Sequence, residues 1–196
     1  MRGLYALKPW YTRRLDGAVR WAVDRDVSPD VFTWLGVVSA ALAAVAIAVG
    51  AWPFALLFLA GRLAGANLDG AVARARGVSR PWGFVVNELG DRAGDLLMFV
   101  GLAVLLGRLQ GGAGLVLVLV AALVATLPTF VSLAGAGAGA PRINGGPFGK
   151  TERCLVVVVL AAAPGLSPIL LPVMIGLSLV TVGTRLRELH RVLACT

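Results

Sequence analysis

Six long apolar runs constrain how this chain can fold more than any other feature of its sequence. They cover residues 31–50, 53–68, 89–107, 115–133, 154–163 and 166–184. Most of them approach the ~20 residues that an α-helix needs to cross ~30 Å of hydrocarbon. Charged residues make up only 14% of the 196 positions, against about a quarter in soluble domains. The sequence therefore predicts an integral membrane protein.

The predicted fold is an all-α, polytopic membrane protein with six transmembrane helices in one domain over residues 1–196. The fifth run is short and must extend back through Lys150 to span. Residues 1–28 are expected to form an interfacial amphipathic helix, followed by the six-helix bundle over residues 29–196. The apolar positions of the interfacial helix, at helical spacing, are Leu4, Leu7, Tyr11, Leu15, Ala18 and Ala22. Ser28 or Asp30 is suited to cap the helix that begins near Val31.

The basic residues indicate the orientation in the membrane. The formal net charge is +8. Among the connections between apolar runs, the first, third and fifth together contain a single basic residue, Arg108. Apart from Arg62 inside the second run, the remaining basic residues gather before the first run, around the second and fourth connections, and after the last run. The positive-inside rule then places both termini and the 69–95 connection in the cytoplasm, which explains the charge without nucleic acid. Little Lys beside abundant Ala, Gly, Val and Arg suggests a GC-rich bacterial genome and hence the plasma membrane.

A polar string from Asn67 to Asp95 interrupts the apolar pattern. Carboxylates at the ends of apolar helices are costly unless they have partners, so such a string predicts a functional site. On the third predicted helix, Asn87, Asp91 and Asp95 recur every four residues and form one stripe. A second stripe on the preceding helix carries Asp69. Oxygen ligands without His or Cys suit Mg²⁺, Mn²⁺ or Ca²⁺.

Small and basic residues near these acids have more than one interpretation. Gly61, Gly65, Gly90 and Gly94 favour close helix packing, whereas Gly70, Ala73 and Gly83 could also admit a nucleotide or diphosphate to the backbone. Arg74 could pair with phosphate or merely enforce topology. Arg62 lies about 10 Å deeper than Asp69 on the same helix face, and Asp95 is its natural partner. Residues 134–150 are rich in Gly and are expected to form a mobile cytoplasmic loop.

These residues resemble the signature of the CDP-alcohol phosphotransferase (phosphatidyltransferase) family, D-x-x-D-G-x-x-A-R followed after about eight residues by G-x-x-x-D-x-x-x-D. The positions that match are Asp69, Gly70, Ala73, Arg74, Gly83 and Asp91. The resemblance implies transfer of a phosphoryl-linked group from a CDP-linked donor, usually CDP-diacylglycerol, to an acceptor alcohol, with release of CMP. It also implies a divalent cation, Mg²⁺ or Mn²⁺, and a homodimer embedded among membrane lipids.

The same resemblance implies roles for individual residues. Asp91 would be the catalytic base, and Asp69, Asn87 and Asp91 would be the metal ligands. The residues that would adjoin the nucleotide are Gly70, Ala73, Arg74 and Gly83. The acceptor-binding candidates are Asp95, Arg142, Lys150 and Arg153, the three basic ones having topology as their alternative role. The chain departs from the signature at Ala66 and Asn87, where the family has aspartates, which puts a second metal ion in doubt.

Two classes of function remain open at this stage. The first is an active enzyme of phospholipid synthesis. The second is a non-catalytic or redirected relative that binds a CDP-linked lipid or acts as a membrane scaffold. A small transporter is disfavoured because the polar residues gather at one membrane surface, whereas transport sites tend to lie near the bilayer midplane.

Overall fold

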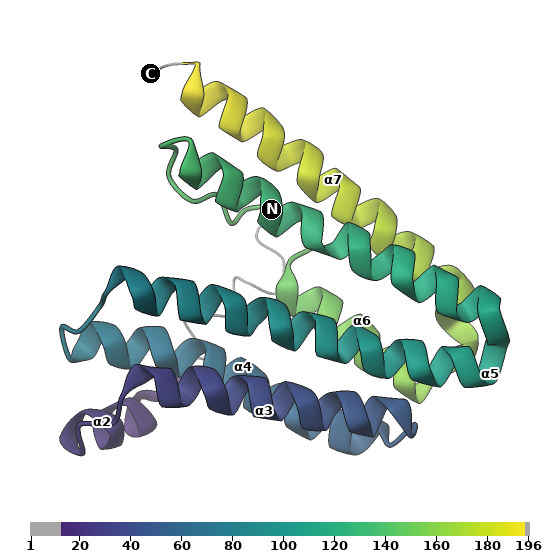
Figure 1. Ribbon diagram of the computed structural model, residues 1–196, viewed down its shortest axis with the longest axis horizontal. Coiled ribbons are helices and arrows are strands. Elements are labelled where there is room, and N and C mark those ends of the chain that lie inside the picture. The colour runs from purple at the N-terminus through teal and green to yellow at the C-terminus, as the bar shows by residue number, and fades with distance from the viewer. Residues whose placement is uncertain (1–12, 195–196) are drawn as a thin grey trace. The chain divides into compact units, whose positions relative to one another are not determined.

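The computed structural model describes residues 13–194, and all regular secondary structure in that range is helical (Figure 1). This confirms the all-α part of the predicted fold class. The elements are α2 (Asp16–Asp24), α3 (Pro29–Ala48), α4 (Trp52–Ala75), α5 (Pro81–Gly137), α6 (Lys150–Ala162), the 3-10 helix η2 (Pro164–Leu166) and α7 (Ser167–Leu193).

Within the described residues, four helical segments are long and apolar enough to cross a membrane: α3, α4, α5 and the continuous stretch from η2 through α7. The 57 residues of α5 are interrupted at Gly111, whose φ of 67° and ψ of −152° are not helical. Each arm of α5, 81–110 and 112–137, exceeds the ~20 residues of a span. Helix α6 has 13 residues and is therefore about 20 Å long. The count of six spans stays a prediction.

The two predicted helices over 89–107 and 115–133 correspond to the two arms of α5, which meet at the non-helical Gly111. The departure from the sequence-based prediction is their extent. The first arm begins at Pro81, and the second continues to Gly137, into the segment that we expected to be a loop from residue 134. Pro is favoured in the first helical turn because its missing N–H has no helical partner there. At the other end, Gly135 leaves room for the side chain of Leu189, so tertiary packing supports helix where composition predicted loop.

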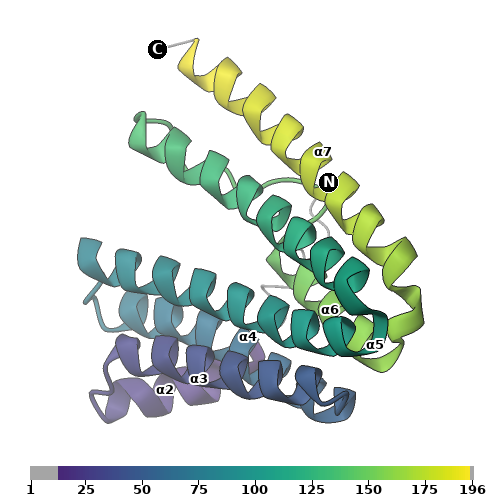
Figure 2. The same cartoon turned by 45° about the vertical axis from the view of Figure 1, so that its right-hand side comes forward.

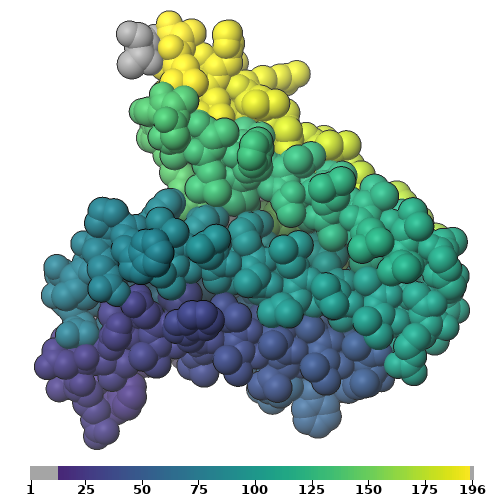
Figure 3. All heavy atoms as spheres, in the orientation of Figure 1, coloured from purple at the N-terminus to yellow at the C-terminus, as the bar shows by residue number. Residues whose placement is uncertain are grey.

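The chain divides into two compact units, one ending at Leu105 and the next beginning at Leu106. In the first unit, α3, α4 and the first arm of α5 lie side by side in both ribbon views (Figures 1 and 2). The space-filling view shows α3 and this arm in direct contact (Figure 3). Glycines allow the approach: a Cβ on Gly65 would lie 2.6 Å from the Phe32 carbonyl oxygen, and one on Gly90 would lie 2.8 Å from Cγ2 of Thr33. The predicted close-packing role of these glycines is confirmed.

Helix α2 packs against this unit through its apolar face. Ala22 is fully buried in a cluster with Phe32, Leu68 and Val72. The predicted apolar positions Leu15 and Ala18 pack against the same cluster. The other predicted apolar positions, Leu4, Leu7 and Tyr11, lie outside the described residues. The inner face of α2 is thus occupied by protein, and its placement along lipid headgroups stays a prediction.

The second unit contains the second arm of α5, α6, η2 and α7. Near the kink in α5, Nε2 of Gln110 donates to the Pro164 carbonyl oxygen at 3.0 Å and to Oγ of Ser167 at 2.8 Å. Ser167 is completely buried. Because the second unit begins at Leu106, Gln110 belongs to it, and these bonds join the kinked part of α5 to the start of α7 within that unit.

Replacing Gly65 with Ala should destabilise the protein by about 1–3 kcal/mol, because the added methyl group meets backbone atoms of α3 that cannot rotate away. The matched control is Gly176→Ala in α7, where nothing lies within 4 Å of the new Cβ. Thermal unfolding in detergent should show a lower midpoint for the first variant only. Equal midpoints would contradict the close packing of α3 and α4.

Candidate active site

Three helices converge on the carboxylate of Asp69, which lies near the end of α4 and is 5% exposed. Its Oδ2 atom accepts a hydrogen bond from Oγ1 of Thr33 in α3 at 3.0 Å. The same oxygen accepts a second bond from Nδ2 of Asn87 in α5. The backbone N–H of Gly70 donates to Oδ1 at 2.5 Å. The facing of the Asp69 and Asn87 stripes, which the sequence predicted, is confirmed.

Thr33 is a site residue whose contact the sequence analysis missed. It lies 36 positions from Asp69, and its local pattern reveals only a helix start. The family's P-N-x-x-T element, which residues 29–33 resemble, is the one signal that singles it out. Its methyl group packs at Gly90, which explains how α3 comes close enough to donate.

Asp91 follows Asn87 by one turn on α5 and is half-buried. Within residues 13–194, no three His, Cys, Asp or Glu side chains come together in a group that could hold a metal ion. The predicted ligand set contains fewer such side chains, the carboxylates of Asp69 and Asp91, together with the amide oxygen of Asn87. The sharing of one cation by Asp69 and Asp91 stays a prediction.

The residues expected around a nucleotide lie at the end of α4 and the start of α5. Arg74 is exposed and folds back along its helix, so that a Cβ on Gly70 would lie 3.1 Å from its Nη1 atom. Ala73 and Gly83 are half-buried. A Cβ on Gly83 would lie 3.4 Å from the side chain of Arg80. Small residues therefore leave room beside the Arg74 guanidinium and beside the aliphatic part of Arg80, whose own guanidinium pairs with Asp30.

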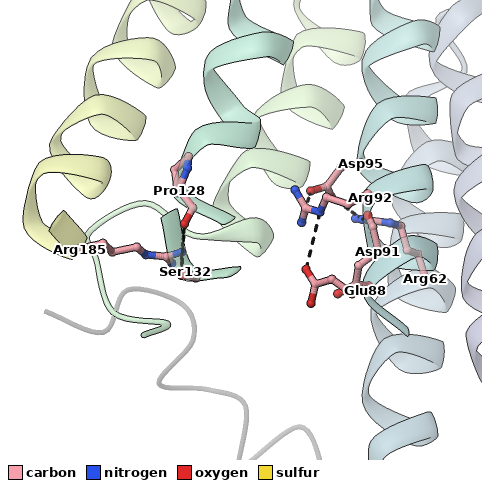
Figure 4. A network of polar contacts seen from close by, with 8 residues as sticks. All are labelled: Arg62, Glu88, Asp91, Arg92, Asp95, Pro128, Ser132 and Arg185. Carbon is pink, nitrogen blue, oxygen red and sulfur yellow. Dashed lines mark hydrogen bonds and ion pairs between the residues drawn. The ribbon is translucent and has the colours of Figure 1, made fainter. Parts of the chain in front are cut away.

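A buried ion-pair network joins α4 to α5 (Figure 4). Its α4 member, Arg62, lies about two turns before Asp69. Nη2 of Arg62 lies 2.5 Å from Oδ1 of Asp95, and these side chains are 2% and 8% exposed. The second oxygen of Asp95 lies 2.9 Å from Nη2 of Arg92. Nε of Arg92 lies 4.0 Å from a carboxylate oxygen of Glu88. The predicted pairing of Arg62 with Asp95 is confirmed.

The four members of this network carry two positive and two negative formal charges. Both oxygens of Asp95 are bound to arginines, which gives this residue a structural role at the helix interface. Its role as an acceptor-binding residue stays a prediction. Glu88, which the sequence analysis did not place in a network, is buried beside Arg92.

Two further arginines fasten the start of α3. Arg76 donates from Nη1 to the carbonyl oxygens of Asp26 and Val27, at 3.0 and 2.7 Å, and pairs from Nη2 with Asp26 Oδ1 at 2.9 Å. Arg80 pairs with Asp30 at 2.6 Å. The sequence suggested a topological role for both arginines, with pairing to phosphate as the alternative for Arg76. Because the bonds hold the chain just before α3, they also restrict Thr33.

The N-terminal cap of α3 is Ser28, one of the two predicted candidates. Its Oγ atom accepts from the backbone N–H of Asp30 at 3.4 Å, and Pro29 occupies the first helical position. The polar residues before Thr33 thus define where α3 begins.

The basic acceptor-side candidates all belong to the second unit. Arg142 is exposed in the connection 138–149, and Lys150 is the first residue of α6. Arg153, one turn further, is 3% exposed. A common anion pocket for the three stays a prediction.

Arg185 of α7 is a buried residue that the sequence analysis treated only as a topological charge. Its guanidinium donates to the Pro128 carbonyl oxygen at 2.5 Å and to Ser132 Oγ at 2.8 Å (Figure 4). It also donates to the Gly145 carbonyl oxygen at 2.8 Å. Ser132 also donates to the carbonyl oxygen of Ile143. The connection that we expected to be mobile is therefore bonded to both α5 and α7.

The family's sequence profile identifies the class of protein. The profile described as CDP-alcohol phosphatidyltransferase matches residues 26–182, and the chain belongs to this family, as its signature residues predicted. It is 29% identical to the phosphatidylinositol phosphate synthase of Cutibacterium acnes over 147 residues, 72% of this chain and 69% of that one. It is also 25% identical to the inner membrane protein YnbA of Escherichia coli, over 84% of this chain and 82% of that one.

Solved structures of the Mycobacterium tuberculosis phosphatidylinositol phosphate synthase (PgsA1) share this fold. The structure with CDP-DAG bound gives a TM-score of 0.73 at 21% identity and covers 88% of this chain and 92% of that one. The complex with manganese and citrate gives 0.71 at 21% identity, covering 88% and 87%. The chain thus has the fold of these proteins as well as the family's sequence pattern.

Removing one partner of the buried pair, by Asp95→Asn or Arg62→Met, should lower the free energy of unfolding by about 3–5 kcal/mol, since the remaining charge is left desolvated. Replacing both residues should cost less than the sum of the single losses. Denaturant unfolding of the single and double variants measures this coupling.

The control is Asp26→Asn, because Asp26 is 88% exposed in its pair with Arg76 and such pairs contribute at most about 1 kcal/mol. Asn also tolerates the positive φ of 52° at this position. Additive losses at Arg62 and Asp95 would refute the coupling.

Proposed function

We propose that this protein transfers a phosphatidyl (substituted phosphate) group from a CDP-linked lipid, such as CDP-diacylglycerol, to an acceptor alcohol and releases CMP. The observation that carries the proposal is the convergence of Thr33, Asn87 and Gly70 on the carboxylate of Asp69. A signature residue held by three helices is a preorganised ligand, because its position is already set before substrate arrives. Family membership supports the same reaction.

The oxygen atoms that could ligate a metal ion at this site fit one hard divalent cation, Mg²⁺ or Mn²⁺. Asp69, Asp91 and the amide oxygen of Asn87 are oxygen ligands of the kind these ions prefer. A bound cation would neutralise charge on the diphosphate. The related synthase has been solved in complex with manganese, which supports this choice of ion.

In the proposed reaction, Asp91 takes the proton of the acceptor hydroxyl as general base. The hydroxyl oxygen forms a new bond to the phosphorus that carries the lipid, and the bond from this phosphorus to the CMP oxygen breaks. CMP leaves with the electron pair of that bond. Arg74 would pair with donor phosphate, while Gly70, Ala73 and Gly83 leave the backbone open to the nucleotide.

The acceptor is proposed to be a small alcohol. Arg142, Lys150 and Arg153 would attract an anionic group on it, since three cations lie within 12 positions of one another at the start of α6. Asp95 would act on the acceptor side indirectly, because its ion pairs with Arg62 and Arg92 hold α5 in place. The synthase from Cutibacterium acnes makes an inositol phosphate lipid by its name, which makes a phosphorylated polyol the first acceptor to test.

We further propose six membrane spans, with both termini and the Asp69 site on the cytoplasmic side of a bacterial plasma membrane, and a homodimeric assembly. The basic residues support this orientation, and the relative YnbA is an inner membrane protein. Counting the two arms of α5 as separate spans and adding α6 would bring the number of spans from four to six.

A second candidate function rests on Ala66 and Asn87, which stand where the family has acids. A relative that lost catalysis would keep the nucleotide cradle and the packing of α3, α4 and α5. Such a protein would bind a CDP-linked lipid or act as a membrane scaffold without releasing CMP.

Purified protein supplied with CDP-diacylglycerol, Mn²⁺ or Mg²⁺ and a panel of alcohols should release CMP. Asp91→Asn should lower the rate about 10²–10⁴-fold, because it removes the general base, while the exposed control Asp16→Asn should leave it unchanged. CMP release can be followed by chromatography. Saturable donor binding without CMP release for any alcohol would favour the lipid-binding alternative.

A further inference from the structure

The hydrogen bond between Asn87 and Asp69 distinguishes this site from a metal site whose ligands are all acidic side chains. Nδ2 of Asn87 donates to the same Asp69 oxygen that accepts from Thr33. An aspartate at position 87 could not donate and would set a second negative charge at hydrogen-bond distance from Asp69. Like charges at this distance oppose each other's ionisation and destabilise the assembled pair.

The neighbouring acids do not restore the missing charge. Glu88 and Asp95 lie beside Arg92 and Arg62, so their charges are already balanced. Ala66 offers no side-chain ligand. Asp69 and Asp91 together carry a formal charge of −2, which balances one divalent cation and leaves a second without a counter-charge.

We propose that this chain carries a one-cation site that is assembled before the cation binds, with Asn87 as the positioning residue that replaces a metal-ligating acid. This inference rests on the proposed function, since it takes Asp69, Asp91 and the amide oxygen of Asn87 as the ligands, while Nδ2 of Asn87 holds Asp69. Thr33 and Asn87 hold Asp69 in place in the absence of the ion, so α3, α4 and α5 remain joined. An all-acid site would instead need cations to offset its own repulsion.

The replacement Asn87→Asp should therefore make the fold depend on the ion. In EDTA, its unfolding midpoint should fall by about 3–6 °C relative to wild type. Saturating Mn²⁺ should recover this loss, whereas wild type should gain less from the same addition. The double variant Ala66→Asp/Asn87→Asp should bind a second Mn²⁺.

The matched control is Asn67→Asp on α4. Asn67 is half-buried and donates to its own helix, at the Leu63 carbonyl oxygen, 2.6 Å away. Aspartate here adds the same charge close to Asp69 but on another helix face. Its loss of stability should not be reversed by Mn²⁺, and its Mn²⁺ stoichiometry should match wild type.

Stoichiometry is measured by electron paramagnetic resonance of free Mn²⁺ during titration of the full chain in detergent. Wild type should saturate at one Mn²⁺ per chain. Two ions per wild-type chain would overturn the inference and leave the proposed transfer reaction intact. No bound Mn²⁺ would overturn both the inference and the metal ligands of the proposed function. An Asn87→Asp protein as stable in EDTA as wild type would overturn the positioning role.

Discussion

The buried pairing of Arg62 with Asp95 is the interaction on which the first unit depends. Two apolar helices in lipid gain little from the hydrophobic effect, so packing and polar contacts must fix their register. Arg62 contacts α5 over several turns, at the Asp91 carbonyl oxygen (3.3 Å), Asp95 (2.5 Å) and Met98 Sδ (3.9 Å). Gly94 provides the room, because a Cβ there would lie 2.7 Å from Nε of Arg62.

The geometry at Asp69 follows from this register. Asp69 lies about two turns beyond Arg62 on α4. When α4 and α5 are locked at Arg62, the start of α5 lies opposite Asp69, and Asn87 reaches it. Helix α3 is added through Gly90 and Thr33, and its start is held by Arg76 and Arg80. The costly burial of the Arg62–Asp95 ion pair thus aligns the hydrogen bond from Asn87 to the Asp69 carboxylate at the candidate site.

Local pattern predicted those features whose cause is local. Helical class, the Ser28 cap and the Asn87–Asp91–Asp95 stripe follow from spacing along one segment, and the Arg62–Asp95 pairing follows from depth and opposite charge. The contacts of Thr33 with Asp69, of Arg76 with Asp26 and of Arg185 with Pro128 join residues 36, 50 and 57 positions apart. No local period encodes such pairs, because tertiary packing brings them together. The extent of α5 was missed for the same reason.

The most direct measurement of this account is the Mn²⁺ affinity of a folded Arg62→Met protein. Removing a positive charge about two turns from Asp69 should strengthen cation binding if only charge matters. Our account predicts the opposite sign, a weaker affinity, because α4 and α5 lose the register that aligns Asp69, Asn87 and Asp91. Unchanged or tighter Mn²⁺ binding in the folded variant would contradict the claim that the buried ion pair positions the site.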